Sequence, residues 1–178
     1  MEIYLMRHCQ TSLNKKHCFY GNIDVDLNEE GRKEAREMHE QYVNLTFDHL
    51  FVSQKTRTIN TAQIIFPQAN PIIIPNLNEF DFGAWEGLTA DEIQSSYPYS
   101  WDRWMKDWQD LSPEQGENYH SFQKRILKEW KILQQKYCNK TIVIVGHLGV
   151  LRTIAQDIRK NNYWDNQFPQ GKLVKIKI

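Results

Sequence analysis

The sequence predicts an α/β domain, a three-layer sandwich with a mostly parallel central sheet flanked by helices. Two observations predict it. Short apolar runs alternate with amphipathic helical patterns along the chain, and no repeat, low-complexity tract or Pro/Gly/Ser-rich linker divides its 178 residues. Alternating strands and helices are the pattern of parallel sheets covered on both faces. The length is typical of one domain, so residues 1–178 are expected to form a single domain.

Four short runs rich in β-branched or other apolar residues are expected as strands. They are EIYLM (2–6), HLFVS (49–53), PIIIP (71–75) and TIVIVG (141–146). Strands buried on both faces of a parallel sheet have this composition, so all four are expected to be buried. KLVKIKI (172–178) instead alternates apolar and polar residues, which predicts a half-exposed strand at an edge of the sheet.

Helices are expected in the segments between these strands. Residues 27–44 offer Asn28 as an N-cap, with acids just after it and cations further on, an order that suits the helix dipole. Residues 55–66 give a shorter pattern that three threonines weaken. Residues 118–137 place apolar side chains at three- or four-residue spacing. Residues 147–160 form a further apolar-faced helix.

Composition excludes several classes of function. Lys and Arg number 22 and are balanced by 22 Asp and Glu, so no overall basic field favours nucleic acid or an anionic membrane. Any anion-binding site must therefore be local. No apolar run reaches the length of a membrane span, and the N-terminus lacks a signal-peptide pattern. The three cysteines favour a reducing compartment, so we expect a cytoplasmic protein without nucleic-acid or membrane partners.

Basic side chains follow three of the predicted strands. Arg7 and His8 follow the first strand, Arg57 comes about one helical turn after the second, and His147 follows the last. Ligands of open α/β sheets bind beyond the carboxyl ends of the strands. Guanidinium groups match phosphate oxygens, and a neutral imidazole nitrogen is a competent nucleophile toward phosphorus. Together these residues predict phosphoryl transfer.

Two His-Cys pairs, His8-Cys9 and His17-Cys18, raise metal binding as an alternative. Adjacent residues at a strand end point in opposite directions, and zinc ligands within a pair are usually two to four residues apart. We therefore expect no metal and no cofactor. Cys9, Cys18 and Cys138 are expected to be small buried or half-buried residues. Four histidines have no motif and are expected at the surface or in satisfied contacts: His17, His39, His49 and His120.

An acidic segment, LNEFDFGAWEG (77–87), follows the third strand-like run and could bring carboxylates to the carboxyl ends of the strands, where the basic residues are expected. Cleavage of a phosphoester requires a proton for the departing oxygen. On chemistry alone Glu79, Asp81 and Glu86 all qualify as that donor. For Asp81 and Glu86 the alternative is loop capping or a solvated charge.

Five segments resemble the motifs of one family in the right order. LMRHCQTSLN (5–14) resembles the Arg-His-Gly-x-Thr signature of the histidine phosphatase superfamily, whose fold is called phosphoglycerate mutase-like. The other four are similar to its later motifs. They are GNIDVDLNEEGRKEA (21–35), VSQKTRTINTA (52–62), LNEFDFGAWEG (77–87) and IVIVGHLGVLR (142–152). This resemblance extends over nearly the whole chain.

The resemblance implies a phosphomonoesterase that acts on a small phosphorylated metabolite without a metal. His8 would attack phosphorus in line and form a phosphohistidine, while Glu79 would protonate the departing oxygen and later activate water. Protonated His147 and two arginines would stabilise the equatorial oxygens. The implied phosphate pocket comprises Arg7, Asn14, Arg57 and His147.

Three positions depart from the family pattern. Cys9 and Leu148 stand where glycine is usual, and Gln10 stands where glutamate is frequent. A cysteine at position 9 would be strained if the backbone there needed a positive φ. Because no charged or nucleophilic position is lost, an active enzyme is expected.

Within the superfamily the chain most resembles α-ribazole phosphatases, which remove the 5′-phosphate of α-ribazole phosphate in cobalamin biosynthesis. LNEFDFGAWEG and PEQGENYHSFQKRI (113–126) carry this closer resemblance. A benzimidazole nucleoside needs flat apolar surface, and four of the six tryptophans lie between Trp85 and Trp108. Trp101, Trp104 and Trp108 recur at helical spacing, which is more typical of a core.

Two alternatives remain at this point. One is a phosphoglycerate mutase or a broad-specificity sugar phosphatase of the same fold, although a mutase is expected to be longer, with a basic tail that excludes water. The other is a non-catalytic module that binds phosphorylated ligands. Release of phosphate from p-nitrophenyl phosphate would separate a phosphatase from a binding module.

Overall fold

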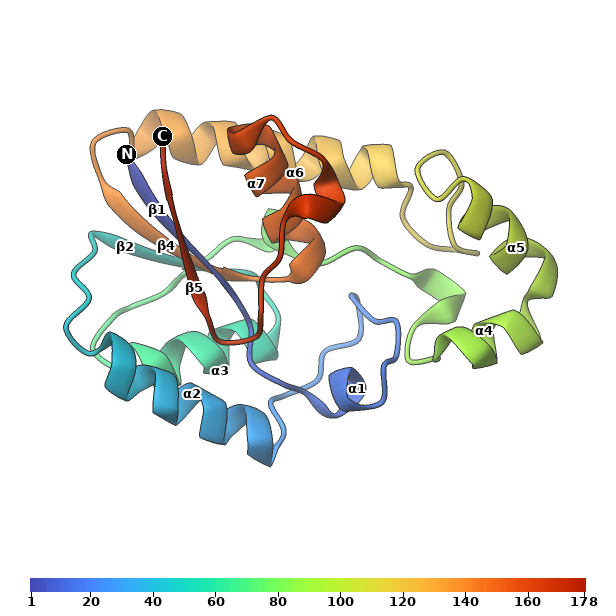
Figure 1. Ribbon diagram of the computed structural model, residues 1–178, viewed down its shortest axis with the longest axis horizontal. Coiled ribbons are helices and arrows are strands. Elements are labelled where there is room, and N and C mark those ends of the chain that lie inside the picture. The colour runs from blue at the N-terminus through green and yellow to red at the C-terminus, as the bar shows by residue number, and fades with distance from the viewer.

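The computed structural model describes all 178 residues and has the predicted three-layer architecture (Figure 1). The sheet has the order β3-β2-β4-β1-β5. Its strands are β1 (Glu2–Arg7), β2 (His49–Val52), β3 (Ile72–Ile73), β4 (Thr141–Gly146) and β5 (Leu173–Lys177). The first four strands run parallel, and β5 pairs antiparallel with β1. The predictions of a mostly parallel sheet and of a half-exposed C-terminal edge strand are confirmed.

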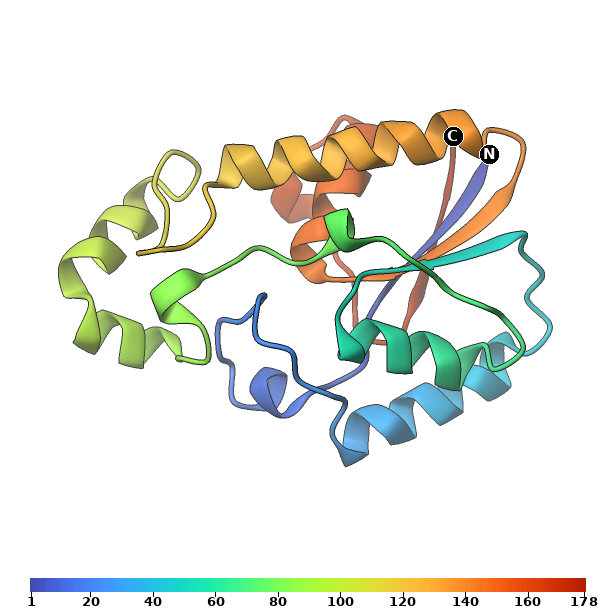
Figure 2. The same cartoon turned by 180° about the vertical axis from the view of Figure 1, so that it is seen from behind.

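The four predicted helices cover the two faces of this sheet, as the front and back views show (Figures 1 and 2). Helices α2 (Glu29–Tyr42) and α3 (Thr56–Ile65) lie on one face, and α6 (Tyr119–Lys136) and α7 (Leu148–Arg159) lie on the other. Asn28 caps α2, accepting a hydrogen bond from the Gly31 N–H at 2.8 Å. Each face has its own apolar core, because buried residues of the strands alternate between the two.

Smaller elements decorate one end of the sheet. The short helix α1 (Ser12–Lys15) follows β1, and α4 (Ala90–Ser96) and α5 (Pro98–Lys106) project beyond the sheet (Figure 1). Three 3-10 turns complete the chain: η1 (Pro75–Leu77), η2 (Gly83–Trp85) and η3 (Tyr163–Asp165). A third cluster formed by Trp85, Ile93 and Trp101 anchors α4 and α5. No helix has both the length and the apolar character needed to cross a membrane.

Two expectations about burial are wrong. The PIIIP segment is not a buried strand: β3 is a two-residue edge strand, and Ile72 and Ile73 are 41% and 50% exposed. Pro71 and Pro75 flank it and lack backbone N–H groups, so the pairing with β2 is confined to the residues between them. Cys138, expected to be at least half-buried, is exposed in the loop after α6.

Candidate active site

His8 lies just beyond the carboxyl end of β1 and is almost completely buried. Its backbone N–H donates to the Gly146 carbonyl at 3.0 Å, which continues the pairing of β1 with β4. The ring Nδ1 lies 2.8 Å from the Cys9 carbonyl oxygen. A carbonyl oxygen only accepts, so the proton belongs on Nδ1 and the lone pair on Nε2 is free. Burial, reinforced by the charges of Arg57 and Arg7, lowers the pKa of His8 well below its ordinary value, which keeps the imidazole neutral.

His147 lies beside His8 at the N-cap position of α7. The two ring centroids are 5.4 Å apart. The His147 Nε2 is 2.7 Å from the Ser53 hydroxyl, whereas its Nδ1 is buried without a partner. Burial and the charge of Arg57 lower the pKa of His147 well below its ordinary value. This shift favours a neutral His147 in the free protein, and the protonated form expected with a bound phosphoryl group stays a prediction.

Arg57 and Arg7 provide the positive charge of the site. Arg57, in the first turn of α3, is fully buried, and its two terminal nitrogens donate to the carbonyl oxygens of Ile23 (2.8 Å) and Gly21 (2.9 Å). The Tyr20 ring lies 4.8 Å from the guanidinium carbon. The Nε atoms of Arg57 and Arg7 are both buried without a partner. Unpaired buried donors are costly, so they mark a place where an anion would bind.

Asn14 is held in one orientation at the end of α1. Its carboxamide oxygen accepts hydrogen bonds from the N–H and hydroxyl of Thr11 (both 3.2 Å) and from the side chain of Gln170 (2.8 Å). The amide nitrogen is thereby left as the available donor. Gln170 forms a backbone bridge with Arg7, which places the Asn14 anchor beside β1. The Asn14 side chain makes no hydrogen bond with the predicted histidines or arginines.

Glu79 is held at the N-terminus of α7, where Gly149 follows His147 by two residues. One carboxyl oxygen accepts from the Gly149 N–H (3.0 Å) and the other from the Phe80 N–H (3.0 Å). A Cβ at position 149 would lie 2.5 Å from the Glu79 Oε1, so a glycine here leaves room for the carboxyl group in this position. Burial raises the pKa of Glu79 and outweighs these hydrogen bonds and the nearby arginines. A carboxyl group with a raised pKa is suited to donate a proton.

The other two candidate acids cap loops, as considered for them from the sequence. Glu86 accepts hydrogen bonds from the backbone N–H groups of residues 21, 22, 23 and 82. Asp81 accepts from the Gly83 N–H (2.9 Å) and the Asn22 side chain (3.3 Å). Both carboxylates are thus committed to holding the backbone of the loops around the site.

The departures from the family pattern cause no strain. Cys9 has no positive φ, is fully buried and donates its backbone N–H to the Thr61 hydroxyl at 3.0 Å. Burial raises the pKa of its thiol to about 12, so it remains a neutral thiol beside His8. Leu148 adds an apolar side chain to the wall of an adjacent cavity. The next residue, Gly149, is a glycine and leaves room for the Glu79 carboxyl group.

That cavity is an aromatic pocket of about 270 Å³ with Glu79 in its wall. Its lining includes nine aromatic residues, which come from separate parts of the chain: Phe19, Phe80, Phe82, Trp104, Trp108, Tyr119, Phe122, Tyr163 and Trp164. Arg152 is its one cation, with its guanidinium 4.9 Å from the Trp164 ring. Trp101 is buried in the core, as expected, whereas Trp104 and Trp108 are half-buried: both pack against the core and both line the pocket.

The remaining histidines lie in satisfied or surface positions, as predicted. The His39 ring is 2.8 Å from the Ile65 carbonyl oxygen, His49 packs on Tyr137, His120 pairs with Asp110 and His17 is exposed. His39 and His49 border a cavity of about 460 Å³ at the start of β2 and β3, at the opposite end of the sheet. Sequence reasoning missed Ser53 and Gln170, because their partners His147 and Asn14 are distant in the chain. The place of Ser53 at the end of the second predicted strand is a signal in the sequence, and Gln170 has none.

Residues 3–178 match the histidine phosphatase superfamily (branch 1). The chain therefore belongs to this superfamily. The predictions of a phosphomonoester-hydrolysing enzyme and of the phosphoglycerate mutase-like fold are confirmed.

Two relatives and one solved structure are similar to this chain over most of its length. The adenosylcobalamin/alpha-ribazole phosphatase of Salmonella typhimurium is 30% identical over 156 residues, which cover 85% of this chain and 76% of that protein. The phosphoserine phosphatase 1 of Hydrogenobacter thermophilus is 26% identical over 156 residues, covering 86% and 74%. The crystal structure of the alpha-ribazole phosphatase from Shigella flexneri superposes with a TM-score of 0.93 at 27% identity, covering 100% of this chain and 91% of that one.

Proposed function

We propose that the protein hydrolyses α-ribazole 5′-phosphate through a phosphohistidine on His8, as part of cobalamin biosynthesis. The observation that carries the choice of substrate is the aromatic pocket against Glu79. The similarity to α-ribazole phosphatases supports the same choice. Three free cysteines fit a reducing compartment, so we place the reaction in the cytoplasm.

In the first step the phosphoryl group moves from the substrate to His8. The Nε2 lone pair attacks phosphorus in line as the bond to the ester oxygen breaks, and Glu79 gives its proton to that oxygen. Arg7, Arg57 and the Nδ1–H of His147 would bind the phosphoryl oxygens, where charge stabilisation lowers the barrier. This assignment accounts for the buried unpaired nitrogens of all three residues. The free amide nitrogen of Asn14 would add a fourth donor.

In the second step water regenerates the enzyme. The Glu79 carboxylate takes a proton from the water, whose oxygen attacks phosphorus as the phosphorus–nitrogen bond breaks. The bonding pair returns to His8 Nε2, and inorganic phosphate departs. The hydrogen bond from Nδ1 to the Cys9 carbonyl holds the imidazole in the same tautomer at both stages.

The pocket suits a leaving alcohol that carries a flat aromatic base. Stacking of a base on aromatic side chains stabilises binding by about 1–3 kcal/mol, and here such side chains surround the leaving-group side of Glu79. A second candidate substrate is phosphoserine or phosphoglycerate, because Arg152 is a cation in the same wall and the phosphoserine phosphatase 1 is a relative. That candidate leaves most of the aromatic lining without a partner.

We expect kcat/KM to be far higher for α-ribazole 5′-phosphate than for p-nitrophenyl phosphate, phosphoserine or 3-phosphoglycerate. Replacing Trp164, which is 53% exposed in the pocket wall, by serine should raise KM for the ribazole ester about tenfold. Steady-state phosphate release measures both effects. Tyr99→Ser is the matched control, because Tyr99 is a 75% exposed aromatic residue that does not line the pocket.

Equal kcat/KM values for all four esters would keep the histidine mechanism and reject the substrate. A preference for phosphoserine or 3-phosphoglycerate would favour the second candidate. No phosphate release from any ester would favour the non-catalytic binding module.

The pH dependence should follow Glu79 and not His8. The pKa of His8 lies well below its ordinary value, so falling pH does not protonate the nucleophile near neutrality. Glu79 must be protonated to donate, and its pKa is raised; the rate on an alkyl ester therefore declines only as pH rises through that raised pKa. The measurement is the ratio of kcat/KM for wild type and Glu79→Gln across pH. Ionisation of the substrate phosphate, whose second pKa is about 6, affects both enzymes equally and therefore cancels in the ratio. A ratio that does not change with pH would contradict the role of Glu79.

A further inference from the structure

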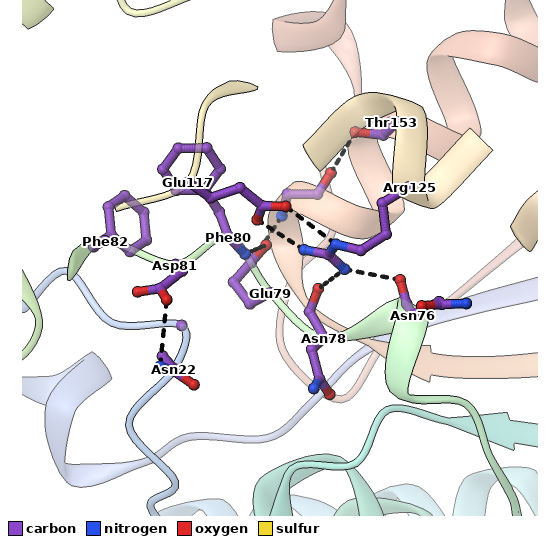
Figure 3. A network of polar contacts seen from close by, with 12 residues as sticks. Asn22, Asn76, Asn78, Glu79, Phe80, Asp81, Phe82, Glu117, Arg125 and Thr153 are labelled. Carbon is purple, nitrogen blue, oxygen red and sulfur yellow. Dashed lines mark hydrogen bonds and ion pairs between the residues drawn. The ribbon is translucent and has the colours of Figure 1, made fainter. Parts of the chain in front are cut away.

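The segment that carries Glu79 contains no strand and crosses between η1 and η2. Arg125 of α6 contacts it just before Glu79 (Figure 3). The Arg125 Nη1 donates to the carbonyl oxygens of Asn76 (2.8 Å) and Asn78 (2.9 Å). No backbone N–H pairs with either carbonyl oxygen. One guanidinium nitrogen thus fixes the two peptide groups that lead into the acid.

Glu117 completes the contact on the other side of the segment. Its carboxylate oxygens accept from Arg125 Nε (3.1 Å) and Nη2 (2.8 Å), and its own N–H donates to the Asp81 carbonyl at 2.8 Å. The Arg125 and Glu117 side chains are only 25% and 18% exposed. A paired, bidentate contact of this kind is geometrically specific. Arg125 therefore holds the segment before Glu79, as Figure 3 shows, and Glu117 holds it after Glu79.

The position of this segment decides whether Glu79 reaches α7. The carboxyl group bonds to the Gly149 N–H at 3.0 Å, and Phe122 on α6, over whose ring Arg125 lies at 5.2 Å, borders the same pocket as Glu79 and Gly149. Helix α6 thus contacts both the segment that carries Glu79, through Arg125, and the wall of the pocket, through Phe122. A small shift of the segment would move the carboxyl group away from a leaving oxygen.

We propose that Arg125 is a positioning residue for proton transfer, which sets the place of Glu79 through the carbonyl groups of Asn76 and Asn78 and through Glu117. The proposal rests on the proposed function, in which Glu79 is the proton donor. Arg125 itself touches neither the substrate nor the reacting atoms. Replacing Arg125 should therefore slow most the substrates whose leaving groups most need a proton.

Leaving groups differ greatly in that need. An alkoxide is a strong base and departs slowly unless it is protonated, whereas p-nitrophenolate is stable enough to depart without a proton. Misplacing Glu79 should thus slow the cleavage of an alkyl ester and spare p-nitrophenyl phosphate. Simple destabilisation of the fold would reduce both rates by the same factor.

The experiment compares kcat/KM for 2-phenylethyl phosphate and p-nitrophenyl phosphate in the full chain, because kcat/KM covers the steps up to cleavage of the ester and leaves out the later attack of water that Glu79 also assists. For Arg125→Met we expect kcat/KM on the alkyl ester to fall about 10- to 100-fold, the scale of a displacement near 1 Å, with a change below about threefold on the aryl ester. Arg125→Lys should not restore the rate, because an ammonium group lacks the planar fork. Lys124→Met is the matched control, since Lys124 is an exposed cation on the same helix.

A double mutant separates a role through Glu79 from an independent one. If Arg125 acts through the acid, adding Arg125→Met to Glu79→Gln should not lower the alkyl-ester rate further. Glu117→Gln, which weakens the contact and retains Arg125, should give the same substrate pattern with a smaller amplitude. It also serves as the test should Arg125→Met fail to fold.

Three results would overturn the proposal: equal losses on both esters, no loss on the alkyl ester, or a multiplicative loss in the double mutant. If Glu79→Gln itself shows no preference between the esters, the proposed role of Glu79 fails. If Glu79→Gln discriminates and the Arg125 and Glu117 variants do not, only the positioning role fails.

Discussion

Replacing His8 by alanine should abolish turnover, with a loss of at least about 10,000-fold in kcat, the scale seen when a covalent nucleophile is removed. The variant should also form no acid-labile phosphoenzyme, because the nitrogen that receives the phosphoryl group in the proposed mechanism is His8 Nε2, whose lone pair is free. Rapid acid-free quenching of the enzyme with ³²P-labelled substrate, followed by acid treatment of the trapped protein, measures both effects. The small cavity left by the imidazole is not expected to prevent folding, which a thermal melt would verify.

The matched control is His17→Asn. His17 is an exposed histidine nine residues further along the chain, and its positive φ suits asparagine. Its phosphoenzyme and kcat should equal those of wild type. A labelled phosphoenzyme in His8→Ala, or the loss of label in His17→Asn, would remove His8 from the role of nucleophile.

Replacing Arg57 by methionine should lower kcat/KM by about 100- to 1,000-fold, as the loss of one preorganised transition-state contact does. Arg57 is fully buried and holds the carbonyl groups of Gly21 and Ile23, and its Nε is free for a phosphoryl oxygen. Arg57→Lys should restore little, because one ammonium group cannot serve both carbonyls and an anion.

Inorganic phosphate provides a second measurement that is independent of turnover. Phosphate that binds the folded state raises its melting temperature, so millimolar phosphate should stabilise wild type and the exposed control Arg36→Met. It should not stabilise Arg57→Met. An equal thermal shift in all three proteins would show that the anion binds elsewhere.

The residues at the strand ends were predictable, because two rules of general validity locate them. Apolar runs of four to six residues identify the buried strands, and ligands bind beyond their carboxyl ends. Arg7, His8 and His147 satisfy both rules directly. The same reasoning failed for PIIIP, where composition indicates a buried strand and the two prolines decide otherwise.

The rest of the site depends on contacts that no local pattern encodes. Glu79, Asp81 and Glu86 lie within eight residues of one another, and only their hydrogen-bond partners distinguish a carboxyl group at α7 from two loop caps. The Ser53 hydroxyl is hydrogen-bonded to His147, which is 94 residues away in the sequence. Such partners follow from the packing of the sheet and helices, so the sequence indicates the chemical groups and the fold assigns their contacts.

The aromatic pocket separates the part of the molecule that selects from the part that reacts. Its outer walls come from α5, the loop after it and η3, whereas the histidines and arginines of the proposed mechanism lie at the ends of β1 and β4 and at the start of α3. Glu79, in the wall of the pocket, is where the two regions meet. Mutations in those peripheral segments can reshape the pocket without moving the histidines. This modular arrangement makes substrate preference evolvable at little risk to catalysis, and it offers one physical reason why phosphatases named for different esters share this fold.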